Sequence, residues 1–360
     1  MNSSGVSVLE QNYPASSISC WAGAFSALGP VLASVTPSEQ GLSHNAVLKS
    51  FDLLANSLKS LKKSGEDIFC TDTLIDAGAD YTLSGLVALA LERLGFGAED
   101  ITLVQPLLAA SVLGEIPHRL AYHSTAHFRK VLHHAIRLIV MDSQLVNHSN
   151  SALSKEQAVL LMIAACIHDL GHDGSSNISS GQYEPGRLEQ RSCALAEPYL
   201  TAAGLSEGAL SFLRTMVLCT DASRPDNPSC PLSQLKAAYH HHFSDFSGKS
   251  EHSAGQVFAF LRNRKDLTLL AMYLHEADIM SSAGVSYERT QCETIQFKQE
   301  RGEGAARPSD VLEFFDTICR GGFLTQAGKA LAQRPHESIR AAVELDFERG
   351  NAVYRNQESC

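Results

Sequence analysis

The sequence predicts an all-α protein, and three observations lead to that expectation. From about residue 45 onward, apolar residues recur at spacings of three and four, the period of a helix with one buried face. No alternating run of strand-like length interrupts this pattern, and Gly- and Pro-containing stretches separate its segments. We therefore expect a compact multi-helix domain.

The expected helices follow one another along the chain. The clearest is 45–63, in which Val47, Phe51, Leu54 and Leu58 recur at helical spacing. Further helices are expected at 82–95, 102–114, 125–146, 155–169, 187–203, 206–219, 254–262, 266–282 and 309–333. Two stretches rich in Pro, Gly or polar residues, 221–234 and 300–308, are expected to be loops.

These elements suggest one main domain over residues 41–340. Residues 1–40 are rich in Ser, Gly, Ala and Pro and carry little charge, so we expect an N-terminal extension or loosely packed cap. Residues 341–360 are expected to form a C-terminal tail. We find no internal repeat in the sequence.

Composition and charge exclude several classes of protein. Hydrophobic residues make up 44 % of the chain and charged residues 19 %, which is typical of a globular protein. The net charge of −10 gives no general attraction to nucleic acid or to an anionic membrane. No stretch approaches the roughly 20 apolar residues of a membrane helix. An anionic substrate would therefore need a local positive charge to bind, for which a bound cation is the obvious source.

Two further absences bear on compartment and function. The nine cysteines include no Cys-x-x-Cys pair, which favours free thiols in a reducing compartment and a cytoplasmic location. The sequence also has no Gly-rich phosphate-binding loop, which argues against a P-loop nucleotide enzyme.

Three segments carry candidate metal ligands. His168 and Asp169 stand together at the end of an apolar helix, and His123 and His127 lie four residues apart at a helix start. Asp278 ends another apolar helix, where a carboxylate is costly unless it is paired or bound to metal. Two imidazoles and two carboxylates suit Zn²⁺, Mn²⁺, Fe²⁺ or Mg²⁺. The alternative for each residue is an ordinary capping or solvated side chain.

The order of these motifs resembles the HD superfamily of metal-dependent phosphohydrolases, and within it the class I cyclic nucleotide phosphodiesterases. Residues 122–127 match the family motif Tyr-His-Asn-x-x-His, with Ser124 in place of Asn. Residues 168–177 match His-Asp-x-x-His-x-Gly-x-x-Asn. The family's Leu-Glu, Thr-Asp and Ala-Asp pairs follow in the same order, as Leu188-Glu189, Thr220-Asp221 and Ala277-Asp278. The resemblance covers roughly residues 45–335.

The resemblance implies hydrolysis of 3′,5′-cyclic nucleotides, cAMP or cGMP or both, to 5′-monophosphates by a hydroxide shared between two divalent metals. The first metal, often zinc, would be held by His127, His168, Asp169 and Asp278. Asp169 would bridge to the second metal, Mg²⁺ or Mn²⁺.

The resemblance also implies roles for residues around the metals. His172, Glu189 and Thr220 would hold waters of the second metal. His123 would be the general acid that protonates the departing 3′ oxygen. Tyr122 and one of Phe314 and Phe315 would contact the substrate, although both Phe residues fit a core position as well.

Several departures from the family pattern leave the substrate open. The Gln that holds the purine falls on Val311, and the Asn after the third motif is Ser281. The Glu-Phe-x-x-Gln-Gly-Asp motif survives only as 296–299, which leaves Glu293 as a possible partner for the acid histidine. Alternatives are therefore an HD-type hydrolase of another phosphodiester or of a phosphomonoester, or a catalytically weak relative that binds a nucleotide or a protein. We interpret the His240-His241-His242 tract as a solvated loop.

Overall fold

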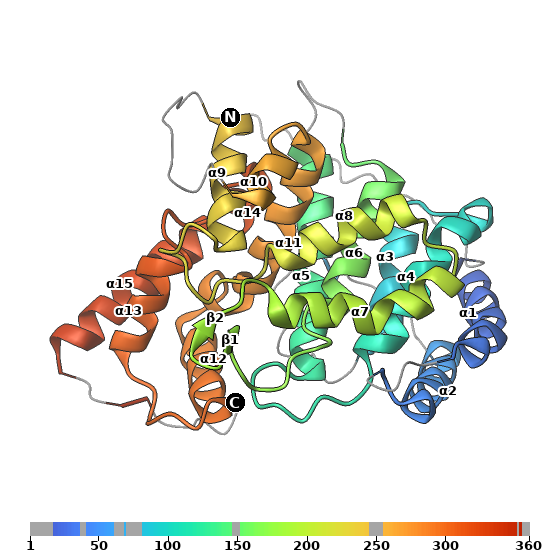
Figure 1. Ribbon diagram of the computed structural model, residues 1–360, viewed down its shortest axis with the longest axis horizontal. Helices are drawn as coiled ribbons and strands as arrows, with labels where there is room; N and C mark the ends of the chain where they lie inside the picture. Colours follow the sequence, from blue (N-terminus) through green and yellow to red (C-terminus); the bar gives the residue numbers. More distant parts are fainter. Residues whose placement is uncertain are drawn as a thin grey trace, which may run out of the picture.

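The computed structural model describes residues 17–36, 41–60, 68–69, 81–145, 152–244, 255–350 and 353–354, and within them the chain is predominantly helical (Figure 1). The α-helices are α1 (Ser17–Ser34), α2 (His44–Ser60), α3 (Leu83–Arg93), α4 (Ile101–Gly114), α5 (Thr125–Leu145), α6 (Lys155–Ile167), α7 (Arg187–Ala202), α8 (Glu207–Leu218), α9 (Pro231–Phe243), α10 (Gln256–Leu261), α11 (Lys265–Ala283), α12 (Tyr287–Glu300), α13 (Pro308–Thr317), α14 (Gln326–Gly328) and α15 (Arg334–Glu348). The other elements are η2 (Ala98–Asp100), η4 (Lys329–Gln333), β1 (Ile178–Ser179) and β2 (Gln182–Tyr183). The predicted all-α fold class is confirmed.

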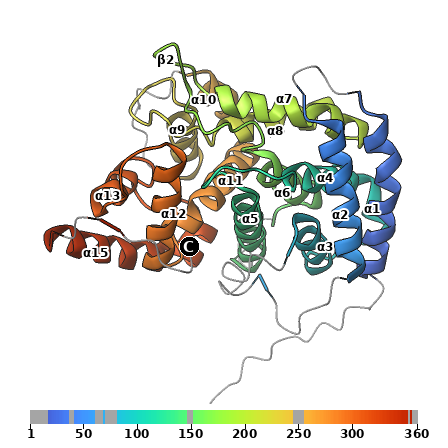
Figure 2. The same cartoon turned by 90° about the horizontal axis from the view of Figure 1, so that it is seen from below.

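Three helices, α5, α6 and α11, form the centre of the molecule and pack on one another. The part of α6 from Ala158 to Ile167 is buried, and so is most of α11. A helix that is apolar on all sides is stable only when other helices surround it. Figure 2 shows α1 and α2 at one edge of the molecule and α13 and α15 at the opposite edge, with these central helices between them.

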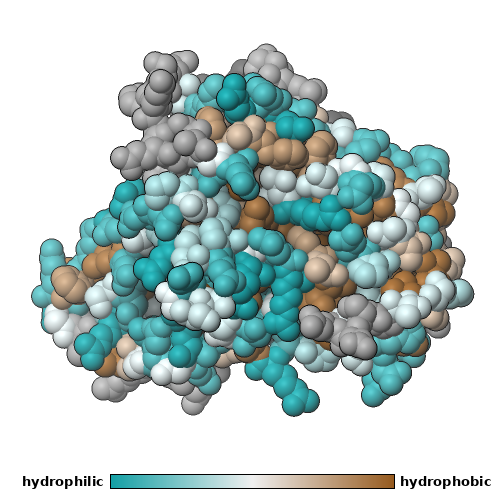
Figure 3. Space-filling model, viewed as in Figure 1, coloured by the Kyte–Doolittle hydropathy of each residue, from teal (hydrophilic) through white to brown (hydrophobic). Residues whose placement is uncertain are grey.

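The surface agrees with the composition. The face of the molecule in Figure 3 is covered mainly by hydrophilic residues, with smaller hydrophobic groups between them. Among the described helices, none combines the length and the apolar character that crossing a membrane requires.

Most predicted helices are confirmed to within a few residues. The helices expected at 45–63, 82–95, 102–114, 125–146 and 155–169 correspond to α2, α3, α4, α5 and α6, although residues 61–63 and 146 lie outside the described residues. Those expected at 187–203, 206–219, 254–262 and 266–282 correspond to α7, α8, α10 and α11, although residue 254 lies outside the described residues. Helix α6 ends at Ile167, before the expected end, because residues 168–171 form a turn.

The single helix predicted over 309–333 is wrong. The structure has α13 and then a break, followed by α14, η4 and α15. Gly321 and Gly322 lie in the break with φ of 88° and 69°, a left-handed conformation that a helix cannot continue through. The periodicity of this segment persisted across the break because the apolar residues on both sides face the same core.

The loop predicted over 221–234 ends earlier than expected, because α9 begins at Pro231. Proline suits the first turn of a helix, where its missing N–H group would have no helical partner. The histidine tract 240–242 forms the last turn of α9 rather than a loop, and His242 Nε2 lies 2.9 Å from the carbonyl oxygen of Leu261. The helices α12 and α15 were also not predicted.

The expected N-terminal extension, 1–40, contains α1, which packs on α2, α3 and α4. Trp21, Phe25, Leu28 and Leu32 from α1 are buried in the core. A loosely packed cap would not bury four large side chains, so the described part of this segment belongs to the main helical body. The division into residues 1–40, 41–340 and 341–360 itself stays a prediction.

The described cysteines are mostly free thiols, as expected. The free thiols are Cys20, Cys166, Cys193, Cys219, Cys230 and Cys319, and all of these except Cys20 are buried. Cys292 is disulfide-bonded, so the prediction of free thiols is wrong at that position.

Candidate metal centre and active site

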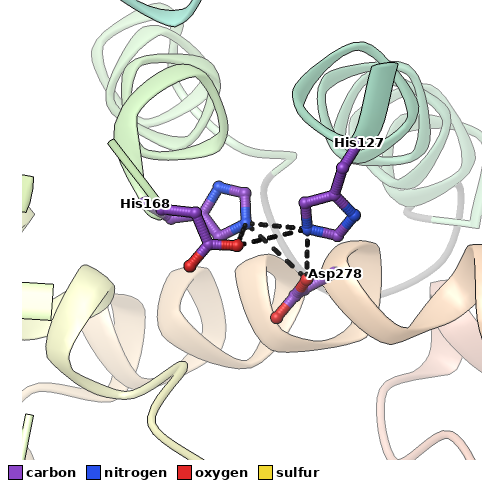
Figure 4. A group of neighbouring side chains, drawn as sticks. His127, His168 and Asp278 are labelled. Atoms are coloured by element: carbon purple, nitrogen blue, oxygen red, sulfur yellow. Dashed lines mark hydrogen bonds and ion pairs between the residues drawn. The ribbon is translucent and has the colours of Figure 1, made fainter. Parts of the chain in front are cut away.

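Four candidate metal ligands meet where the central helices pack together. His127 lies in the first turn of α5, His168 and Asp169 directly follow α6, and Asp278 lies near the end of α11. Ligand atoms of all four residues lie within 4.8 Å of one another. Figure 4 shows the imidazoles of His127 and His168 facing each other next to the Asp278 carboxylate. The structure thus brings together the four residues that the motifs singled out.

The arrangement of donor atoms fits a divalent cation. The Nε2 atoms of His127 and His168 lie 3.2 Å apart, and Asp278 Oδ1 lies 3.1 Å from the first and 3.6 Å from the second. Asp169 Oδ2 lies 3.3 Å and 3.0 Å from the same two nitrogens. The His168 Nδ1–H group donates to the carbonyl of Ala165, which leaves the Nε2 lone pair directed at this cluster. Two imidazoles and two carboxylates are a ligand set that zinc and related metals accept.

The electrostatics of this cluster favour a positive charge between the two carboxylates. Burial raises the pKa of Asp169 and of Asp278, but the nearby imidazoles more than offset it and leave both values below the ordinary range. Burial lowers the pKa of His127 and of His168, but the two carboxylates more than offset it and leave both values raised. Both carboxylates are therefore ionised and attract a cation.

A close approach between two segments holds the His-Asp turn in place. The Gly171 N–H group donates to Ser192 Oγ on α7 at 2.8 Å, and Ser192 Oγ donates to the Leu188 carbonyl. A Cβ atom at Gly171 would lie only 2.7 Å from the Ser192 backbone nitrogen. Only glycine allows α7 to pack this tightly under the ligand-bearing turn.

His123 lies in the turn before α5, beside the candidate metal ligands. Its Nε2 is 3.8 Å from Asp169 Oδ2, and its Nδ1–H group donates to Glu300 Oε1 at 2.5 Å. The other oxygen of Glu300 accepts hydrogen bonds from the backbone N–H groups of Tyr122 and His123, each at 2.9 Å. Burial raises the pKa of Glu300, but these hydrogen bonds bring it down to about 2. Glu300 therefore holds the imidazole with Nε2 directed toward the cluster.

Glu300 is a residue that the sequence reasoning missed. Glu293, the partner considered for His123, instead accepts hydrogen bonds from Lys130, Ser281 and Ser282. Glu293, Phe297 and Glu300 stand at positions i, i+4 and i+7 of α12 and line one cavity. That spacing was a usable signal, because it places Glu300 on the same helix face as the Phe of the surviving motif.

The groups expected around a second metal line the same cavity, which has a volume of about 510 Å³. Glu189 lies in the first turn of α7 and accepts a hydrogen bond from Asn177 Nδ2 at 2.9 Å. Thr220 is buried and lines the same cavity. Burial and the nearby Asp221 raise the pKa of Glu189 to about 8. Without a cation the Glu189 carboxyl is therefore largely protonated at neutral pH, and a second cation bound nearby would favour its ionised form.

His172 stacks on His123, with ring centroids 3.5 Å apart and planes inclined by 20°. His123, His172 and Glu300 also bring ligand atoms within 4.8 Å of one another. Imidazole lone pairs lie in the ring plane, so two nearly parallel stacked rings aim poorly at one ion. We therefore interpret His172 as a neighbour of His123, the expected proton donor, and not as part of a separate metal site.

Aromatic side chains line another part of the cavity, which we call its aromatic end. Phe297 on α12 and Phe314 on α13 contribute to its wall, as does Tyr122. Phe315 is not among the lining residues: it is buried in the core, with its ring 4.6 Å from that of His336. Of the two Phe residues predicted as possible substrate contacts, Phe315 therefore does not fit that role. The packing of α13 turns Phe314 toward the cavity instead. Val311 is buried as well and offers no hydrogen bond there.

Comparisons with solved structures agree with this fold. The chain resembles the phosphodiesterase domain of the RhoPDE fusion protein from the choanoflagellate Salpingoeca rosetta, with a TM-score of 0.52 and 16 % sequence identity over 81 % of this chain and 95 % of that chain. It also resembles LmjPDEB1, solved in complex with IBMX, with a TM-score of 0.51 and 17 % identity over 86 % of this chain and 99 % of that chain. No protein-family model matches the sequence, and no curated protein matches it significantly. The chain has the fold of phosphodiesterase domains, as its motifs predict.

Proposed function

We propose that the chain is a metal-dependent phosphodiesterase that hydrolyses 3′,5′-cyclic nucleotides to 5′-monophosphates. The observation that carries this proposal is the convergence of His127, His168, Asp169 and Asp278 next to the oriented imidazole of His123. It is supported by the phosphodiesterase fold, and one structural neighbour was solved with IBMX bound.

The proposal assigns the four converging residues to the first divalent metal, zinc by the resemblance. Asp169 is the residue best placed to reach a second ion, Mg²⁺ or Mn²⁺, because its carboxylate also lines the cavity shared with Glu189 and Thr220. Divalent cations at such a site lower the proton affinity of water and polarise phosphoryl oxygens. They also attract the anionic substrate, which the chain with its net charge of −10 would otherwise repel.

His123 is the proposed general acid. Its Nδ1–H group is held by Glu300, so Nε2 is the nitrogen available to the substrate. The attacking water would first release one proton to the solvent, and as the resulting hydroxide oxygen forms its bond to phosphorus, the bond from phosphorus to the 3′ oxygen breaks. The proton on Nε2 then passes to that leaving oxygen. Glu300 stabilises the charged imidazole before the transfer and keeps its orientation fixed.

The aromatic end of the cavity is proposed to hold the base. Phe314 and Phe297 offer ring surfaces, and base stacking on aromatic rings tolerates different bases. Buried Val311 provides no polar contact that would separate adenine from guanine. This observation also favours the second candidate function, hydrolysis of another phosphodiester by the same metal centre.

Metal analysis combined with a substrate panel tests the proposal. Purified protein is assayed with Zn²⁺, Mg²⁺ and Mn²⁺ against cAMP, cGMP, bis-p-nitrophenyl phosphate and p-nitrophenyl phosphate. We expect bound metal and turnover of at least one cyclic nucleotide. Turnover of bis-p-nitrophenyl phosphate alone would indicate that the substrate is another phosphodiester and not a cyclic nucleotide. Absence of both metal and turnover would favour a binding protein.

A further inference from the structure

The ring of Tyr122 is wedged between the two histidines with different proposed roles. Its centroid lies 4.8 Å from that of His123 in an edge-to-face contact, and 5.0 Å from that of His127 in a tilted contact. A third edge contact, at 5.6 Å, joins it to Phe297. The position of this ring therefore limits where the proton donor and one metal ligand can lie.

A chain of hydrogen bonds, partly buried at Tyr122 and buried at Glu293, holds the Tyr122 hydroxyl. Ser282 Oγ lies 3.1 Å from the Tyr122 oxygen and donates its own hydrogen to Glu293 Oε2 at 2.7 Å. Because the serine hydrogen is used in that bond, the Tyr122 O–H group must donate to Ser282. The order is thus Tyr122 to Ser282 to Glu293.

Glu293 anchors this chain in the core. It is 2 % exposed, and its other oxygen, Oε1, accepts from Lys130 Nζ at 2.6 Å and from Ser281 Oγ at 2.6 Å. Lys130 lies three residues after His127 on α5, and Ser281 and Ser282 lie three and four residues after Asp278 on α11. A buried carboxylate needs such a cation and such donors, and these come from the two helices that carry metal ligands.

We propose that Glu293 is a positioning residue, which acts through Ser282 to fix the Tyr122 ring between His123 and His127. The proton donor and the metal ligand thereby keep their relative placement. This inference rests on the proposed function for its effect on rate, although the geometric part holds for any role of the site. A purely structural ion pair between Glu293 and Lys130 is the competing explanation.

The two serines separate these explanations, because only one of them leads to Tyr122. Ser282→Ala removes the link from Glu293 to Tyr122, whereas Ser281→Ala removes a hydrogen bond of equal kind from the same carboxylate and leaves that link intact. We expect Ser282→Ala to lower kcat about 10-fold with KM changed less than 2-fold. We expect Ser281→Ala to keep kcat within 2-fold, and both variants to lose similar thermal stability.

Tyr122→Phe tests the same link from its other end. It should lower kcat about as much as Ser282→Ala, and the double variant should be no slower than either single variant, because both break one hydrogen bond. Equal losses of kcat in the two serine variants, a wild-type rate for Ser282→Ala, or additive losses in the double variant would each overturn the proposal.

A second readout does not depend on activity. In imidazole ¹⁵N–¹H spectra of the Zn²⁺-loaded protein, Ser282→Ala should move the signals of His123 and His127, and Ser281→Ala should leave them in place. If the wild-type chain turns over none of the substrates, the proposed function fails while these spectra still test the positioning. Unmoved signals in Ser282→Ala, or equal movement in both variants, would refute it.

Discussion

The two ends of the cavity are built in different ways. The metal end takes its candidate ligands from α5, α11 and the turn directly after α6, and His127 is 2 % and His168 is 0 % exposed. The aromatic end lies on the peripheral helices α12 and α13, where Phe297 is 37 % exposed. Ion coordination needs fixed atoms, which buried helices supply, whereas ring stacking tolerates displacement. If the proposed function holds, this difference predicts that the chain holds the metal centre tightly and the base loosely.

The strongest test of the metal end is Asp169→Ala. We expect activity to fall by at least about 10³-fold and metal content to fall with it, because this carboxylate touches both proposed sites. Metal analysis and turnover are measured on the same preparation. Asp173→Ala is the matched control, because Asp173 lies four residues on, is partly exposed and pairs with Arg191. Unaltered turnover in Asp169→Ala would contradict its bridging role.

Removing the proton donor should separate catalysis from metal binding. In His123→Ala we expect kcat to drop about 10²–10⁴-fold, with metal content retained. The substrate bis-p-nitrophenyl phosphate sharpens the test. Its leaving group needs little protonation, so its hydrolysis should be slowed less by His123→Ala than that of a cyclic nucleotide. Equal losses for this substrate and for a cyclic nucleotide would argue against a general acid at this position.

The buried carboxylate of Glu293 is expected to make the stability of the fold depend on pH. Burial raises the pKa of Glu293, but Lys130 and the two serines bring it down to about 2. Because the folded pKa lies below the unfolded one, the carboxylate stabilises the fold above about pH 4.5, and this contribution is lost as pH falls toward 2. The expected contribution at neutral pH is on the order of 3 kcal/mol.

Denaturant unfolding at pH 7 and pH 3 measures this contribution. Glu293→Gln should be less stable than wild type at pH 7, with a smaller difference at pH 3. Glu288→Gln, on the exposed face of the same helix, serves as the control and should match wild type at both values. A difference that does not change with pH would rule out the ionised carboxylate as its source.

The smallest effect is expected at the aromatic end. Phe314→Ala should raise KM for a cyclic nucleotide about 10-fold with little change in kcat, because one stacking surface is lost. Phe315→Ala, one residue away, should instead lower the free energy of unfolding by about 3–5 kcal/mol, because it empties a core position. If Phe314→Ala changes kcat and leaves KM unchanged, the contrast between the two ends of the cavity fails.

Sequence reasoning reached the metal end more completely than the aromatic end. His123 and His127 lie four residues apart, a spacing that places two side chains on one face of a helix, and His168 and Asp169 are adjacent at the end of an apolar helix. Their order along the chain, together with Asp278, predicted the convergence that the structure shows. Helix α9 and the broken segment after α13 were missed because local turn chemistry at Pro231 and Gly321-Gly322 outweighed the apolar periodicity.

By itself, the sequence determined the helical character of the chain, the types of the candidate ligands and the end of α6 from which two of them project. Tertiary structure alone decided that Glu300 and not Glu293 holds His123. Both stand on one face of α12, and only the packing of that helix decides which carboxylate reaches the histidine. Tertiary structure likewise decided between Phe314 and Phe315. Adjacent side chains on a helix point about 100° apart, so only one of the two can face the cavity. Local spacing specifies which side chains can share a face, but the neighbouring helices select the side chain that enters the cavity.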